Sequence, residues 1–238
     1  MNLRDLLLPI VTVALLAANV IVLAIYGEYV SRIMRFFSMV AFFFLFLRSK
    51  YYKSSALIIF SAFVLNDLLL IFFETVMSQN LVLFIRLCAY ILLAKLVLPY
   101  LRKIKIKLFE GLLFATILLM NVWLLYSIQD SINAVSNGGW LGEFLVYGYG
   151  TAAILSVIAA FAFYSRYVDK TSIFFLLAVI GLVMSDLTYF IGFYLDFPEF
   201  YYLDRSFNIV AIGFLLHFLF LFKKKIARGF YDMAGENL

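Results

Sequence analysis

The chain has 238 residues, of which 66% are hydrophobic and only 14% are charged. Soluble domains carry about 25% charged residues and far fewer apolar ones, so this composition excludes a soluble domain and indicates an all-α integral membrane protein. The formal net charge of +5 does not predict nucleic-acid binding, because the Lys and Arg residues lie in short clusters between apolar stretches. The single cysteine, Cys88, excludes an internal disulfide and a metal site built on cysteines.

Eight apolar stretches are each long enough to cross the ~30 Å core of a bilayer as a helix. In chain order they cover approximately residues 6–26, 30–47, 55–75, 81–101, 108–128, 144–164, 172–195 and 206–222. The first resembles a signal peptide, but its apolar run is too long and no small-residue cleavage site ends it, so we expect it to remain as a helix. The sequence predicts one membrane domain over residues 1–238.

We divide this domain into four parts. Residues 1–128 hold the first four to five helices, 129–142 form an external loop that contains SNGG, 143–222 hold the last three helices, and 223–238 form a short basic tail.

Charge placement predicts the orientation of the spans. Lys and Arg cluster on one side, at residues 4, 48–53, 102–107, 166–170 and 223–228. The opposite loops are mainly acidic, with Glu28, Asp130, Glu143, Asp196, Glu199 and Asp204, and have Arg32 and Arg205 as basic exceptions near helix ends. Because basic loops stay in the cytoplasm, we expect both termini on the cytoplasmic side of a bacterial inner membrane.

Two apolar spans carry an aspartate in their interior, Asp67 in LNDLLLIFF and Asp186 in MSDLTYFIG. A charge at such depth costs about 2.5–3.5 kcal/mol on insertion scales, so it normally faces a bundle interior or a wet cavity. The two acids are 119 residues apart, half of the 238-residue chain. This spacing predicts a parallel internal repeat of four plus four helices with one acid in each half.

Several other polar side chains reach the same depth. At a rise of 1.5 Å per residue, Arg35 and Arg86 come level with the two acids, and Arg205 lies slightly higher. Helical spacing adds Glu74 to the face of Asp67, Tyr189 to that of Asp186 and Tyr90 to that of Arg86. We expect the two carboxylates to face one water-accessible chamber near the outer leaflet, where arginine suits a phosphate.

Two simpler interpretations remain open. The aspartates and arginines can pair merely to neutralise one another and fix the helix packing. Arg35 and Arg205 can instead extend to the membrane interface.

Taken in order, several short motifs resemble the lysoplasmalogenase-like (YhhN) family of multi-pass membrane proteins. The motifs are Arg35-Phe36 on the second span, FSAFVLND ending in Asn66-Asp67 on the third, EFLVYGYGTAA with Tyr149 on the sixth, LVMSD ending in Ser185-Asp186 on the seventh, and NIVAIGFLLHFLF on the last. The chain departs from the family on the fourth span, where RLCAYI has Leu87 or Cys88 in the place of a histidine. It also has Asn66 where the family has glycine, and Arg-Phe where the family has Lys-Pro.

The resemblance implies hydrolysis of the vinyl-ether bond of a lysophospholipid, which releases a fatty aldehyde. Such cleavage needs an acid to protonate the alkenyl carbon and a base to deliver water, and Asp67 and Asp186 can divide these tasks in either order. We expect substrate binding by Arg35, Arg86, Glu74, Arg205, Tyr90, Tyr149, Tyr189, Asn66 and Ser185.

Other functional classes are less well supported by the sequence. It has no Gly-rich phosphate loop, zinc-protease motif or serine-hydrolase motif, and one histidine, so we expect no cofactor and no metal. The expected partner is a membrane lipid or lysophospholipid, with a protein partner as an open alternative. A non-enzymatic membrane subunit or lipid-binding scaffold, and a small transporter, are the rival functions.

Overall fold

The computed structural model describes residues 3–48, 54–101 and 139–226, together with the single positions 116, 119, 123 and 126. The elements are α1 (Leu3–Arg48), α2 (Ser54–Leu70), α3 (Val76–Val97), the 3-10 helix η1 (Leu98–Leu101), α5 (Gly139–Tyr167), α6 (Lys170–Tyr194) and α7 (Phe200–Ile226). Within the described ranges no strand occurs, and five of the helices are long and apolar enough to cross a membrane. The prediction of an α-helical membrane protein is therefore confirmed.

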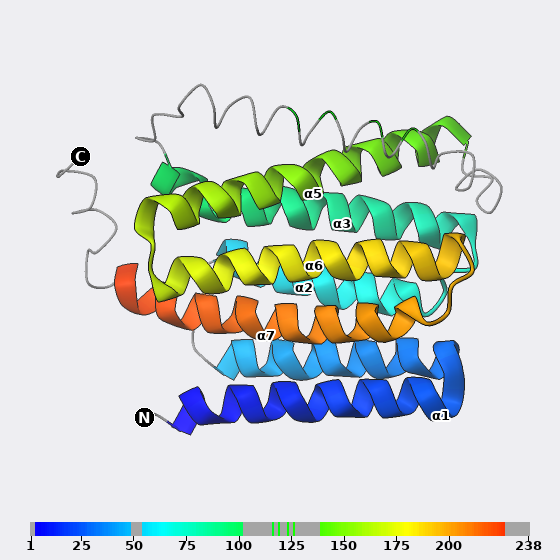
Figure 1. Ribbon diagram of the computed structural model, residues 1–238, viewed down its shortest axis with the longest axis horizontal. Helices are drawn as coiled ribbons and strands as arrows, with labels where there is room; N and C mark the ends of the chain where they lie inside the picture. Colours follow the sequence, from blue (N-terminus) through cyan, green and yellow to red (C-terminus); the bar gives the residue numbers. More distant parts are fainter. Residues whose placement is uncertain are drawn as a thin grey trace.

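Helix α1 is a hairpin of two helices that meet at Gly27. This residue has φ 77° and ψ −170°, a backbone conformation that glycine adopts without steric cost. Figure 1 shows the two arms side by side, with the reversal at the end of the bundle opposite the N-terminus. Asn19 donates a buried hydrogen bond of 2.7 Å to Ser38 Oγ on the other arm. The break predicted between residues 26 and 30 is confirmed.

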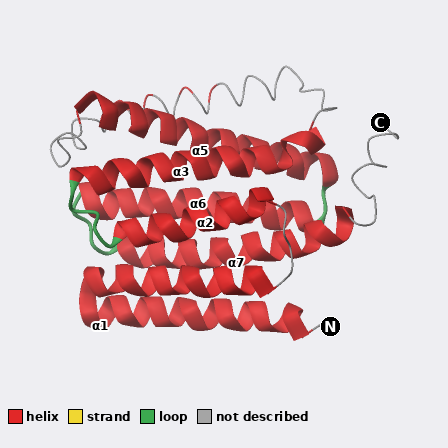
Figure 2. Ribbon diagram, turned by 180° about the vertical axis from the view of Figure 1, so that it is seen from behind, coloured by secondary structure: helices red, strands yellow, loops and turns green. Residues whose placement is uncertain are grey.

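The described helices pack as a closed ring. Each helix contacts the next one in the order α1, α2, α3, α5, α6, α7, and α7 contacts α1. In Figure 1, α6 lies in front of α2, and Figure 2 shows the reverse order from behind. Side chains from α1, α2, α3, α6 and α7 can therefore meet in the interior of one bundle.

Small residues allow several of these helices to approach closely. A Cβ placed on Gly181 of α6 would lie 2.9 Å from the Cβ of Ala211 on α7. A Cβ on Gly213 of α7 would lie 2.8 Å from Thr12 Oγ1 on α1. Such contacts are typical of membrane helices, which associate through close packing rather than through the hydrophobic effect.

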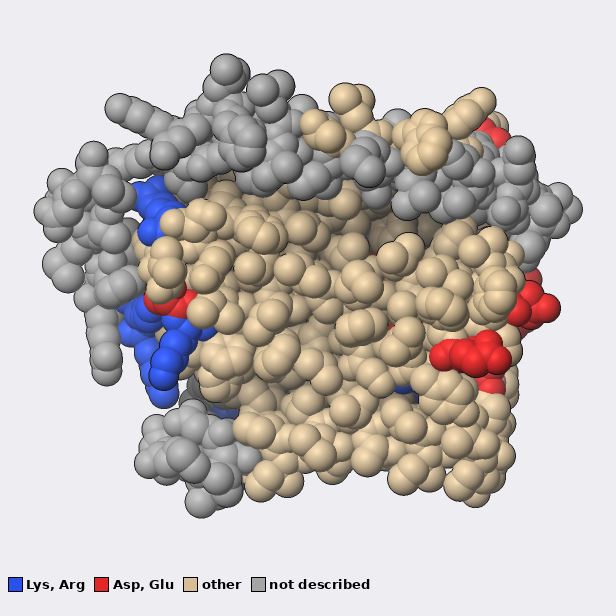
Figure 3. Space-filling view, in the orientation of Figure 1, with Lys and Arg blue, Asp and Glu red and all other residues tan. Residues whose placement is uncertain are grey.

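Charges separate to the two ends of the bundle (Figure 3). Lys and Arg gather at the end where α7 finishes with Lys223–Lys225, and Asp and Glu gather at the opposite end, where Asp196 and Glu199 lie between α6 and α7. At the basic end, Asp169 caps α6 in a capping box with Ser172, and Lys225 forms an ion pair with Asp169. The N-terminus and the end of α7 lie at this same basic end (Figure 1).

Several predicted boundaries are wrong. Helix α2 ends at Leu70, not at residue 75, because the next five residues form a turn and Thr75 caps α3 by accepting a hydrogen bond from the Ser78 N–H. Helix α7 starts at Phe200 rather than at residue 206, directly after the Pro198 turn, and it extends to Ile226. Helix α5 starts at Gly139, so the end of the predicted external loop is helical.

Other predicted segments lie outside the described residues. These are most of the span at 108–128, the loop residues 129–138 and the tail from residue 227. Positions 116, 119, 123 and 126 are helical and exposed, and their spacing places them on one face of a helix.

Candidate functional site

Three aspartates and three arginines of the described residues meet inside the ring. We call this group the polar layer; its members are Asp67, Asp186, Asp204, Arg35, Arg86 and Arg205. No side chain of the polar layer is more than 11% exposed. Three carboxylates balance three guanidinium groups, which lowers the cost of holding charges in an apolar bundle.

Asp204 lies at the centre of the largest hydrogen-bonded cluster in the polar layer. Arg35 Nη1 on α1 donates to both of its carboxylate oxygens, at 2.9 and 2.8 Å, and Arg205 forms an ion pair with it. Ser185 Oγ on α6 donates to Asp204 Oδ1 at 2.6 Å, and Arg205 Nε donates to Ser31 Oγ at 2.8 Å. Asp204 thus joins α1, α6 and α7.

Asp67 on α2 is attached to the edge of this cluster. Its Oδ1 lies 3.2 Å from Arg35 Nε and accepts a hydrogen bond of 3.3 Å from the Asn66 side chain. Arg35 therefore pairs with two carboxylates: Nη1 donates hydrogen bonds to Asp204, and Nε lies at ion-pair distance from Asp67 without a hydrogen bond. The Asp67 side chain is 3% exposed.

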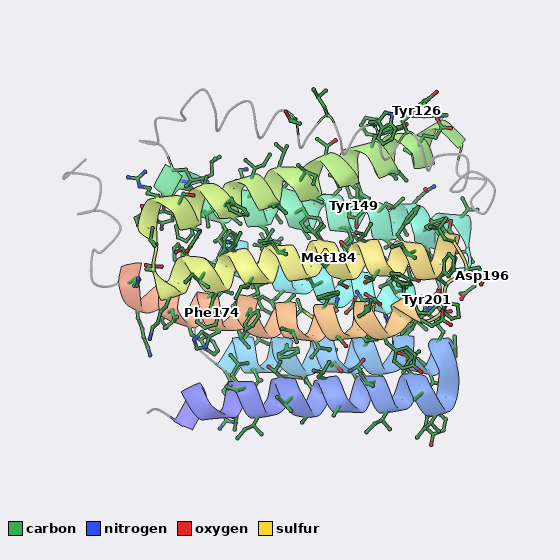
Figure 4. All side chains as sticks on the ribbon, viewed as in Figure 1. Tyr126, Tyr149, Phe174, Met184, Asp196 and Tyr201 are labelled. Atoms are coloured by element: carbon green, nitrogen blue, oxygen red, sulfur yellow. The ribbon has the colours of Figure 1, made fainter. Side chains whose placement is uncertain are left out.

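Asp186 on α6 is held by side chains from α3 and α5. Arg86 Nη1 lies 2.5 Å from Asp186 Oδ1, and the Tyr90 hydroxyl donates to Oδ2 at 2.6 Å. The Tyr149 hydroxyl interacts with the same carboxylate, and its ring centroid lies 5.9 Å from that of Tyr90. Figure 4 labels Tyr149 on α5, the helix next to α6. The Asp186 side chain is 11% exposed, more than the other two polar-layer aspartates.

The two predicted acids do not touch each other. Within the described residues no hydrogen bond or ion pair joins the Asp67 and Asp186 carboxylates, and each has its own arginine. Arg86 lies between them: it interacts electrostatically with both, and its guanidinium carbon is 5.7 Å from the ring centroid of Phe63, one helical turn before Asp67. Arg86 thus interacts with both acids, and the shared chamber stays a prediction.

The structure brings most of the predicted binding residues into contact with an aspartate of the polar layer, which for Arg205 and Ser185 is Asp204. Those residues are Arg35, Arg86, Arg205, Tyr90, Tyr149, Asn66 and Ser185. Arg35 and Arg205 are only 2% and 0% exposed, so the alternative that they extend to the membrane interface is wrong.

Glu74 and Tyr189 lie elsewhere. Because α2 ends at Leu70, Glu74 does not share the helical face of Asp67; it is 62% exposed and pairs with Arg32, which also binds Glu28. Tyr189 packs edge-on against Phe73, with ring centroids 5.5 Å apart, and its buried hydroxyl has no hydrogen-bond partner. These residues form an outer cluster next to the polar layer.

Sequence reasoning missed Asp204, which we assigned to an external loop. A signal for its burial exists, because Asp204, Asn208, Ala211 and Leu215 recur at helical spacing and are all buried. Treating the helix as starting directly after Pro198 would have placed Asp204 on this stripe.

The polar layer can perform proton transfer and anion stabilisation. A partly accessible carboxylate beside a guanidinium group and a tyrosine hydroxyl can accept a proton from water and steady developing charge. Asn66 Oδ1 and Arg205 Nη2 are buried without hydrogen-bond partners, so they retain bonding capacity for water or a polar headgroup. Among the described residues, no three His, Cys, Asp or Glu side chains are placed so that they could hold a metal ion together.

Comparisons with known proteins do not assign a family. No protein-family model matches the chain, and no curated protein or solved structure matches it. The functional argument therefore depends on the residues and their geometry.

Proposed function

We propose that this protein is an eight-span enzyme of a bacterial inner membrane, with both termini in the cytoplasm, that hydrolyses the vinyl-ether bond of a lysophospholipid. In this proposal the two arms of α1 and the helices α2, α3, α5, α6 and α7 are seven of the spans, and the sequence predicts the eighth at residues 108–128, which lie mostly outside the described residues. The separation of charge between the two ends of the bundle supports the orientation (Figure 3). The resemblance to the lysoplasmalogenase-like family motivates the choice of bond.

The environment of Asp186 carries the proposal. Among the three polar-layer aspartates it is the most accessible, and it is held by both Arg86 and Tyr90. These contacts fix the carboxylate in one orientation, as a base that activates water requires. Arg86 can also hold the phosphate of a headgroup.

Asp67 is the better candidate for the acid. It shares Arg35 with Asp204, and its ion pair of 3.2 Å is the longest in the polar layer, so it is the least neutralised of the three carboxylates.

Asp67 gives its proton to the alkenyl carbon, and the ether carbon becomes oxocarbenium-like. Water adds there and passes a proton to Asp186. The hemiacetal collapses to a fatty aldehyde and the glycerophospho headgroup, and the proton held by Asp186 returns to Asp67.

Aldehyde release by the purified protein tests this proposal. With a lysoplasmalogen as substrate, Asp186→Asn and Asp67→Asn are each expected to lose activity by at least about 100-fold, the usual contribution of a general acid or base. Asp196→Asn, at the exposed turn before α7, is the matched control and should retain activity. Activity that survives in both site variants would refute the assignment.

A non-enzymatic scaffold is the second candidate, and the charge balance of the polar layer favours it. Three aspartates that exactly neutralise three arginines need no substrate to explain their burial. This function predicts a stoichiometric protein partner after mild solubilisation and no turnover of any lysophospholipid. Turnover that depends on Asp186 would exclude it.

A further inference from the structure

Besides Arg86, which interacts with both candidate acids, Asp204 offers a second link between them. Through Arg35, which donates to both Asp204 oxygens, it holds the guanidinium group that faces Asp67. Through Ser185, it is bonded to the helical turn that carries Asp186. Asp204 itself is completely buried and makes no hydrogen bond to either acid within the described residues.

We infer that Asp204 is a positioning residue that fixes Asp67 and Asp186 relative to each other, through Arg35 on one side and Ser185 on the other. The two links come from different helices, α1 and α6, and converge on one carboxylate of α7. A shift of α6 along α7 would break the 2.6 Å bond from Ser185 and move Asp186 relative to Arg86. This inference rests on the proposed function for its kinetic readout.

Removing Asp204 directly is an unsuitable first test. Arg35 would keep only its ion pair with Asp67, Arg205 would lose its carboxylate partner, and an uncompensated buried charge can prevent folding. Ser185→Ala is cleaner, because it breaks the link to α6 without changing the charge of the polar layer. Thr188→Val is the matched control: Thr188 is also buried on α6, but its hydroxyl bonds only to the carbonyl groups of Met184 and Ser185 in its own helix.

The kinetic test separates positioning from stability. Ser185→Ala is expected to lower kcat on the order of ten-fold, with KM changed less than about two-fold, since a small misplacement of a reacting group affects the chemical step most. Thr188→Val should leave both constants near the wild-type values, and Ser185→Thr, which keeps the hydroxyl, should recover most of kcat. Wild-type kcat in Ser185→Ala would overturn the inference.

A second measurement does not need activity. A lipid-soluble carbodiimide forms a stable adduct with accessible carboxyl groups, and mass spectrometry reports the modified residue. Loosening α6 should raise labelling of Asp186 several-fold in Ser185→Ala but not in Thr188→Val. Unchanged labelling would overturn the positioning role. A wild-type protein that releases no aldehyde, while Asp186 labelling still responds to Ser185→Ala, would refute the proposed function and leave the positioning role intact.

Discussion

Arg86 Nη1 on α3 lies 2.5 Å from Asp186 Oδ1 on α6, so an ion pair joins two helices that are not neighbours in the ring. Tyr90, one turn further along α3, strengthens this link through its bond of 2.6 Å to Oδ2. The pair both holds the bundle together across its interior and fixes the carboxylate that we assign as the base.

Arg86→Gln should therefore unfold more easily than the wild type. Breaking a buried ion pair by removing one partner typically costs about 3–5 kcal/mol, because the remaining charge stays buried without compensation. Denaturant titration in detergent micelles measures the change. The double variant Arg86→Gln/Asp186→Asn restores charge balance, and it is expected to recover most of the stability without recovering aldehyde release. A double variant as unstable as the single one would contradict this account.

Glu74→Gln should have little effect. Glu74 is 62% exposed, and exposed ion pairs contribute about 0–1 kcal/mol. Thermal melts at low and high salt, together with aldehyde release, are the measurements. A loss of activity larger than about three-fold would return Glu74 to the substrate-binding group in which the sequence placed it.

Gly181→Ala should destabilise the packing of α6 against α7. The added Cβ would lie 2.9 Å from Ala211 Cβ and 3.5 Å from its Cα, and forcing a methyl group into a packed interface costs about 1–3 kcal/mol. Gly142→Ala on α5 is the matched control, because its Cβ would meet only Asn80 Oδ1 at 3.4 Å. Equal melting temperatures for the two variants would contradict the close packing of α6 against α7 at Gly181.

Cysteine labelling tests the orientation. In a Cys88→Ala background, Glu199→Cys lies at the exposed turn before α7 and Lys224→Cys near its end. A membrane-impermeant maleimide should modify the cysteine at position 199 in intact spheroplasts and the one at 224 only after the membrane is opened. The reverse pattern would show that the termini are external.

The elements that the sequence predicted well are those with the strongest signals. Long apolar runs define the helices, and the rarity of buried charge selects Asp67, Asp186, Arg35 and Arg86. The pairing of Arg86 with Tyr90 follows from helical spacing, and both side chains contact Asp186.

The sequence did not predict the contacts that depend on where a helix ends or on which helices pack against each other. Glu74 lies seven residues after Asp67, but helix α2 ends at Leu70 and a turn follows. The helical spacing that starts at Asp67 therefore does not extend to Glu74. The bonds from Arg35 and Ser185 to Asp204 depend on α7 packing beside both α1 and α6, and no local pattern encodes that neighbourhood.

The distance along the chain between Arg35 and Asp204 also bears on biosynthesis. Their hydrogen bonds span 169 residues, so Arg35 is made long before Asp204, whereas its other carboxylate partner, Asp67, follows on the next helix. An isolated arginine at this depth is expensive in lipid. Arg35 can pair with Asp67 as soon as α2 has been made, whereas its hydrogen bonds to Asp204 can form only after the start of α7 has been synthesised.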